Sequence, residues 1–337
     1  MEREKKPKKF IYIWSILGAL ALIIGFSVMF FGQHIIDYFS GRDYVPTAEM
    51  AEIIEHLELT DDADLILRAV HPILQETEEF NKHCPNRDEE MSTLGCYSPT
   101  DNRIYIYKIE SNELDGIEES VLAHELLHAI YQRMNNIERT GVNHELQSYY
   151  NRHAEQFGDY LKSYSDEQYY TELHSVIGQR VKSSEMSRIL RDHYSKYFKD
   201  QEKIAEYYSQ YRAVFDELKT NIETLSAEVE TTRAEINEKR EAYQAHLEEY
   251  ERISQEIRKN IEKGVYKDSR AIQAQYNYIS SLYDQTETER LKLNEDINAF
   301  NEKVAELNTY IERSNALNRI INSRTDTKTE GTPETDK

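Results

Sequence analysis

Two histidines and a glutamate stand close together in VLAHELLHAIYQ, residues 121–132. His124 and His128 are four positions apart, so both imidazoles project from the same face of a helix. This spacing allows two ring nitrogens to reach one Zn²⁺ at about 2.0–2.1 Å. Glu125 can take a proton from a water that the metal acidifies. The HExxH pattern therefore predicts a zinc-dependent hydrolytic site, with two ordinary helix histidines as the alternative.

A catalytic zinc also needs a third protein ligand and an open position for water. Glu172 is the preferred prediction, because its segment TELHSVIG surrounds it with apolar neighbours and a buried carboxylate needs a partner. A solvated helix carboxylate is the ordinary explanation of Glu172, and the alternative ligands are Glu155, Glu145 and Asp159. The side chain that stabilises an oxyanion could be any of four nearby groups, His174, Tyr164, Tyr169 or Tyr170.

Parts of the segment from about residue 90 to 180 resemble a known family. VLAHELLHAIYQ resembles the active-site helix of zincin metallopeptidases, and GCYSPTDNRIYIYKI resembles the edge strand that aligns their substrates. The sequence does not continue into the longer zinc-binding motif of metzincins, because Tyr131 stands where that motif has glycine and Met134 where it has a third histidine. The remaining resemblance is to gluzincins, whose ligand helices carry the Glu-x-x-Ser pattern found at Glu172. It implies that an extended substrate lies against the strand at 103–109.

The elements that must position these residues follow from hydrophobic spacing. Residues 102–109 are rich in isoleucine and tyrosine, which predicts a strand. The HExxH segment has helical spacing, and two more helices are expected over about 143–162 and 166–182. The sequence therefore predicts an α+β, zincin-like catalytic domain over 49–200, with a small sheet packed on an active-site helix and then a helical subdomain.

Polar residues mark where several of these helices begin. Thr47 is the expected cap of the first helix, and Asp61 or Asp62 of the second. Ser165 and Gln168 fit a capping box before the helix that contains Glu172.

The carboxy-terminal part has a different pattern. Apolar or tolerated positions recur every three to four residues over 218–257 and again over 272–311, which is typical of a coiled coil. Gly264 separates the two runs, so residues 201–322 are predicted to form an antiparallel hairpin with arms roughly 70–80 Å long; one continuous dimeric rod is the alternative. Residues 323–337 have few apolar side chains and are expected to be disordered.

The amino-terminal part indicates a membrane anchor. Residues 1–9 are basic, and residues 10–32 contain no charged side chain. A helix needs roughly 20 such residues to cross a bilayer, and the basic cluster predicts a cytoplasmic amino terminus. We therefore expect a single-pass cell-membrane protein with a juxtamembrane linker at 33–48 and an extracytoplasmic catalytic domain. A cleaved signal peptide is the alternative.

Cysteine content and charge narrow the class of protein further. Cys84 and Cys96 are the only two cysteines, and outside the cytoplasm such a close pair is expected to form a disulfide. The formal net charge of −21 argues against non-specific binding to nucleic acid.

The sequence as a whole predicts a zinc metalloendopeptidase. One Zn²⁺ per chain would be bound by His124, His128 and Glu172, and Glu125 would be the general base. The expected partners are a peptide or protein substrate, the membrane and a protein that binds the coiled coil. The alternative is a coiled-coil structural or binding protein of the cell envelope, with a vestigial or structural metal site.

Overall fold

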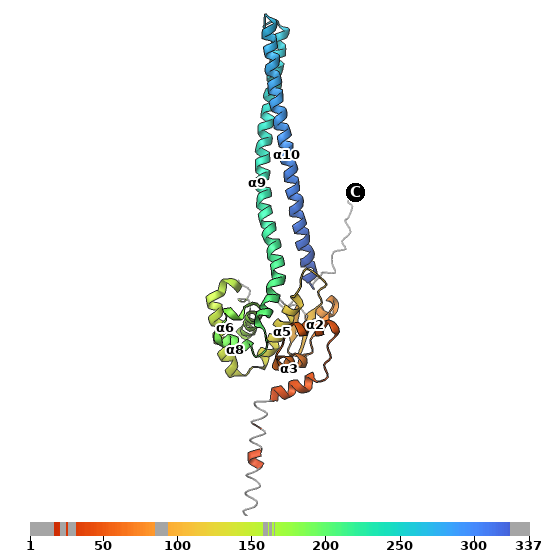
Figure 1. Cartoon of the computed structure of the whole chain (residues 1–337), viewed down its shortest axis with the longest axis vertical. Coiled ribbons are helices and arrows are strands. Elements are labelled where there is room, and N and C mark those ends of the chain that lie inside the picture. Colours follow the sequence, from red (N-terminus) through yellow and green to blue (C-terminus); the bar gives the residue numbers. More distant parts are fainter. Residues whose placement is uncertain are drawn as a thin grey trace, which may run out of the picture. The chain divides into compact units, whose positions relative to one another are not determined.

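The computed structural model describes residues 17–20, 25, 32–84, 94–157, 161, 164 and 166–323 (Figure 1). The chain divides into two compact units, Met1–Val214 with Asn318–Lys337, and Phe215–Leu317. No helix among the described residues is long and apolar enough to cross a membrane. The basic tail, most of the predicted membrane segment and the carboxy-terminal tail after Ser323 lie outside the described residues, so those three expectations stay predictions.

A small sheet of three strands lies in the first unit. Its order is β1 (Ile73–Gln75), β3 (Arg103–Tyr107), β2 (Gly95–Ser98). The central strand β3 pairs in parallel with β1 and antiparallel with β2. The prediction that a substrate lies against residues 103–109 is therefore wrong, because most of this segment is β3, which is hydrogen-bonded on both sides. The isoleucines and tyrosines of β3 reflect burial in the centre of a sheet.

The described residues of the first unit are otherwise mostly helical, consistent with the predicted α+β class. The helices are α2 (Ala48–His56), α3 (Asp61–Ala69), α4 (Thr77–His83), α5 (Ile117–Arg133), α6 (Asn136–Phe157), α7 (Asp166–Arg180) and α8 (Arg188–Tyr194). A further helix covers residues 32–41; it begins at the last residue of the predicted membrane segment and otherwise lies in the segment 33–48 that was expected to be a linker.

A threonine side chain caps the amino-terminal end of both α2 and α3. The Thr47 hydroxyl accepts a hydrogen bond from the Met50 amide, which confirms the predicted cap of α2. The prediction that Asp61 or Asp62 caps α3 is wrong, since Thr60 is the cap and accepts from the Ala63 amide. Both aspartates lie in the first turn of α3 instead, where carboxylates favour the positive end of the helix dipole. Ser165 of the expected capping box lies outside the described residues.

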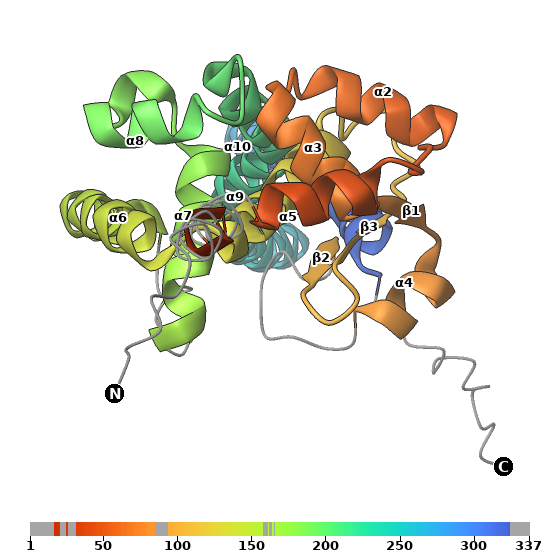
Figure 2. The same cartoon turned by 90° about the horizontal axis from the view of Figure 1, so that it is seen from below.

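Helix α5 carries the HExxH motif and is buried along most of its length. It packs against β2 and β3 on one side and against α7 on the other, as Figure 2 shows. Twelve of its seventeen residues are buried, and they are distributed around the helix rather than along one stripe. Such a helix lies inside a fold, so its polar side chains need partners from neighbouring elements.

A disulfide joins the end of α4 to β2. The predicted bond between Cys84 and Cys96 is present, with Cα atoms 6.0 Å apart. Both cysteines pack with Phe80 and Tyr105 in a small core cluster. The bond therefore fixes β2, the strand nearest the HExxH motif, to the preceding helix.

The second unit is made by two long helices, α9 (Gln201–Glu262) and α10 (Ser269–Ile321), in their parts between Phe215 and Leu317. Ion pairs join the two helices in opposite order: as the residue number rises along α9, the number of its partner on α10 falls. The pairs are Glu228–Lys303, Lys239–Asp296 and His246–Glu289. The two predicted runs thus form an antiparallel hairpin within one chain rather than a continuous rod.

Candidate metal centre

Three side chains from α5 and α7, of which His124 and Glu172 are buried and His128 is partly exposed, converge on one point. The Nε2 atoms of His124 and His128 are 3.1 Å apart. Glu172 lies opposite them, with Oε1 3.6 Å from His124 Nε2 and Oε2 3.3 Å from His128 Nε2. This is the one group of three or more His, Cys, Asp or Glu side chains in the described part of the chain whose ligand atoms lie within 4.8 Å of each other. The group could hold a metal ion.

The other predicted ligands lie elsewhere. Glu155 is exposed on α6, and Glu145 lies 3.5 Å from the exposed His144. Asp159 lies outside the described residues. Glu172 is 1% exposed, on the face of α7 that packs against α5, so the geometry favours it among the candidate carboxylates.

Gln179 orients the first histidine. Its amide nitrogen donates to the backbone oxygen and the hydroxyl of Ser120, at 2.9 and 3.0 Å. The amide oxygen therefore faces His124 Nδ1, 3.3 Å away, and can only accept a hydrogen bond. In the neutral ring the proton accordingly lies on Nδ1, so the Nε2 lone pair faces the cluster, as metal binding requires.

Thr171 plays a similar part for the second histidine. Its hydroxyl lies 3.0 Å from His128 Nδ1, so this ring too has its far nitrogen engaged. The His128 side chain is 14% exposed, compared with 1% for His124. His128 is therefore the ligand nearest to solvent. On α7, Thr171, Ser175 and Gln179 follow one another at four-residue spacing, which places them on one helix face.

Burial acts on both carboxylates of the site, with opposite outcomes. It raises the pKa of Glu125, and the nearby imidazoles only partly oppose this. Burial alone would also raise the pKa of Glu172, but His124 and His128 together outweigh it and hold this pKa well below the usual range. Glu172 is thus suited to bind a cation, and Glu125 to accept and hold a proton, since separated pKa values allow two carboxylates distinct roles.

The edge strand β2 holds Glu125 in place. The Tyr97 amide donates to Glu125 Oε2 at 2.7 Å. Leu94 accepts from the Tyr107 amide of β3, so by alternation the backbone groups of Gly95 and Tyr97 point away from β3. A Cβ atom on Gly95 would lie 2.5 Å from Val121 Cγ1 and 3.0 Å from Glu125 Cγ. Only glycine allows β2 to approach α5 this closely.

The predicted oxyanion-stabilising groups are engaged in other contacts. His174 is completely buried, and its Nε2 lies 2.8 Å from His193 Nε2. The Tyr169 ring packs on Tyr150 and Tyr170. Tyr164 is partly buried. None of these contacts singles out one residue for the oxyanion role.

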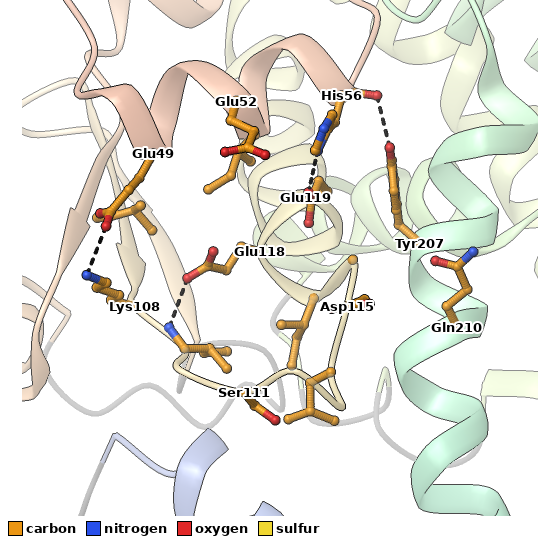
Figure 3. A pocket seen from close by; sticks show the side chains of 16 residues that line it. Glu49, Glu52, His56, Lys108, Ser111, Asp115, Glu118, Glu119, Tyr207 and Gln210 are labelled. Atoms are coloured by element: carbon orange, nitrogen blue, oxygen red, sulfur yellow. Dashed lines mark hydrogen bonds and ion pairs between the residues drawn. The ribbon is translucent and has the colours of Figure 1, made fainter.

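A pocket of about 520 Å³ lies between α2 and the start of α5 and includes none of the three ligands (Figure 3). Two pairs of its charged groups lie in contact. Lys108 lies 3.2 Å from Glu49, and His56 lies 2.7 Å from Glu119. The pocket is acidic, but it does not assemble a set of metal ligands.

Gln179, Thr171 and Gly95 support the site but are not predicted from the HExxH motif. The glycine leaves a sequence signal, since glycine within a strand indicates close backbone approach. Gln179 leaves none, because its partner lies 55 positions away.

No protein-family model, curated protein or solved structure matches this chain.

Proposed function

We propose that this chain is a membrane-anchored, extracytoplasmic, zinc-dependent metallopeptidase. The observation that carries the proposal is the convergence of two HExxH histidines with a buried carboxylate from a second helix. Glu125, the second residue of the motif, lies next to this group on α5. This combination suits hydrolysis of a peptide bond by a metal-activated water.

The donor set favours zinc among the common metals. Two imidazole nitrogens and one carboxylate are the ligands of a catalytic zinc site, which leaves a fourth position open. Bonds of about 2.0–2.1 Å in a tetrahedron separate ligand atoms by roughly 3.3–3.4 Å. The separations of 3.1, 3.3 and 3.6 Å are close to this value. Calcium and magnesium instead prefer sets made of oxygen ligands.

The roles of the chain's own residues follow from their contacts. Zinc supplies Lewis acidity, which polarises a carbonyl and acidifies water. Glu125 takes the proton from the attacking water and delivers it to the leaving amine. The Tyr97 amide binds one oxygen of Glu125, so the other oxygen is the one available for the proton. An extended substrate would lie nearest β2, whose outer edge faces the site.

The proposed location rests on two features of the chain. Residues 10–32 carry no charged side chain and follow a basic segment, as in a single-pass anchor. The Cys84–Cys96 disulfide fits an oxidising compartment outside the cytoplasm. The hairpin of α9 and α10 is the proposed surface for a protein partner.

Metal content and peptide cleavage test this function together. The purified full chain should contain one zinc ion and cleave unstructured protein substrates in a chelator-sensitive manner. Glu125→Gln should keep the zinc and lower turnover by at least about 10³-fold, because it removes the general base. Glu119→Gln, the same change six residues earlier on α5, should leave both the zinc content and the turnover unaffected. Cleavage by Glu125→Gln at the normal rate would exclude the mechanism.

Burial of the group favours a second candidate, a structural metal site in a coiled-coil binding protein. His124 and Glu172 are each 1% exposed, and closed sites are typical of structural zinc. In that case the full chain would bind zinc without cleaving substrates, and removing the metal would lower the unfolding temperature. Stoichiometric zinc with no hydrolysis of any peptide tested would favour this candidate.

A further inference from the structure

The helix at 32–41 has its apolar side chains on the outside. Four large hydrophobic residues are about half exposed or more, at 48%, 61%, 59% and 58% for Ile35, Ile36, Tyr38 and Phe39. Asp37, by contrast, is 3% exposed. In a helix packed on a soluble domain the apolar face normally points inward. Here the pattern is reversed.

The inward face of this helix is fixed to the domain by polar contacts. Arg133, the last residue of α5, binds both carboxylate oxygens of Asp37 at 2.9–3.1 Å. Gly41, one turn after Asp37, packs so closely that a Cβ atom would lie 2.8 Å from Arg68 Cβ. The Ser40 backbone oxygen also lies 2.8 Å from His71 Nε2. These contacts fix which face of the helix points outward.

We propose that the outward face of the 32–41 helix lies in the interfacial layer of a lipid bilayer. The proposal rests on the membrane anchor of the proposed function and adds a second point of contact with the membrane. Interfacial helices bury an apolar face about 5–10 Å into the headgroup boundary. Aromatic residues such as Tyr38 and Phe39 are favoured at that depth.

The preceding sequence is the reason to assign lipid to this face. The uncharged segment 10–32 ends at Gly32, the first residue of the helix. If that segment spans the membrane, the 32–41 helix begins at the bilayer surface. Arg42 follows directly, with its guanidinium 5.9 Å from the centre of the Phe39 ring, and a cation there can reach the headgroups.

The ion pair between Asp37 and Arg133 connects the 32–41 helix to the helix that carries the metal centre. Arg133 also contacts Tyr97, because the Nη1 atom of Arg133 lies 3.5 Å from the Tyr97 hydroxyl. The backbone amide of Tyr97 in turn donates to Glu125. The Asp37–Arg133 pair therefore links the membrane-facing helix to the carboxyl end of α5. The proposed peptidase would then be held at a fixed orientation to the bilayer.

The experiment uses the lack of free cysteine in the chain. Both native cysteines are in the disulfide, so Ile36→Cys and Phe39→Cys each introduce a single reactive thiol. Ile189→Cys on α8 is the matched control, because Ile189 is another isoleucine that is 54% exposed. Each full-length variant is labelled with an environment-sensitive fluorophore and reconstituted in vesicles of phosphatidylcholine and phosphatidylglycerol. Quenching by aqueous iodide and by a spin-labelled lipid is then measured.

Labels at positions 36 and 39 should be quenched by the spin-labelled lipid and should be roughly fivefold less accessible to iodide than the label at 189. Equal iodide quenching at all three positions would overturn the proposal. Shielding from iodide without quenching by lipid would also overturn it, and would show that a second protein chain covers this face. Flotation with the vesicles tests the anchor separately, and peptide cleavage reports on the proposed peptidase independently of both.

Discussion

Two histidine pairs in the first unit have their Nε2 atoms in contact but differ in what surrounds them. His124 and His128 have their Nε2 atoms 3.1 Å apart with the Glu172 carboxylate opposite. His174 and His193 have theirs 2.8 Å apart, but tyrosine rings pack around them. Two imidazoles in contact do not by themselves bind a cation strongly. The buried carboxylate is what distinguishes the candidate metal centre.

The charge state of the second pair follows from the same difference. Burial, followed by the contribution of the Lys196 ammonium, lowers the pKa of His193 to about 4. Burial and the neighbouring His193 lower the pKa of His174 well below its usual range. This pair is neutral at physiological pH, and one N–H···N hydrogen bond accounts for the short distance between the rings.

Removing the carboxylate should have the largest effect. Glu172→Gln deletes the only negative charge among the three proposed ligands, so zinc affinity should fall by more than about 100-fold, beyond the loss expected for a supporting residue. His193→Gln is the control in the other pair and should bind zinc as the native chain does. Competition with a chromogenic chelator measures both. Equal zinc affinity in the two variants would remove the distinction between the pairs.

Removing the support of His124 should have the next largest effect. Gln179→Leu leaves His124 Nδ1 without its acceptor, so the ring can rotate or change tautomer, and zinc affinity should fall by about 10–100-fold. Gln179→Glu keeps the acceptor for His124 Nδ1 but loses the donor to Ser120, so it should bind zinc more weakly than the native chain and more tightly than Gln179→Leu. The same chelator competition separates the two variants. If Gln179→Leu binds zinc normally, the hydrogen bond is not needed to orient the ring.

The buried His193 of the second pair should make the free energy of unfolding depend on pH. The pKa of His193 is about 4 in the folded chain and about 6.5 when unfolded. Above pH 6.5 both states are neutral and the group contributes nothing. As the pH falls toward 4 the unfolded chain binds a proton that the folded chain does not, so stability decreases, by about 2 kcal/mol at pH 5.

Urea unfolding of the native chain and His193→Gln at pH 8 and pH 5, with chelator present, measures this effect. Between pH 8 and pH 5 the free energy of unfolding should fall less in the variant than in the native chain, and the difference should be about 2 kcal/mol. Parallel pH dependence in both proteins would mean that His193 is not buried in its neutral form.

Local patterns in the sequence predicted more of this molecule than distant pairings did. The Thr47 cap, the disulfide and the two helical runs depend on neighbours within a few turns or on a single close pair, and the structure has all of them. The order of the strands depends on pairing between segments far apart, and the central position of β3 was not predicted. Glu172 was preferred because apolar neighbours indicate burial even when the partner is unknown.

Polar contacts between distant elements left no such signal. Gln179 and Ser120 are 59 positions apart, and Asp37 and Arg133 are 96 positions apart. Each of these residues is common on exposed helix surfaces. Their burial depends on which helices meet, and spacing along one segment does not reveal it.

The smallest effect should come from Thr171, the partner of the more exposed histidine. Thr171→Val keeps the shape of the side chain but removes the hydroxyl that lies 3.0 Å from His128 Nδ1. Because the His128 side chain is 14% exposed, a water can replace that partner, and zinc affinity should fall by less than about tenfold. Thr171→Ser keeps the hydroxyl and should match the native chain. A loss as large as that of Gln179→Leu would show that the His128 ring is as dependent on its protein partner as the fully buried His124 ring, and that exposure does not distinguish the two ligands.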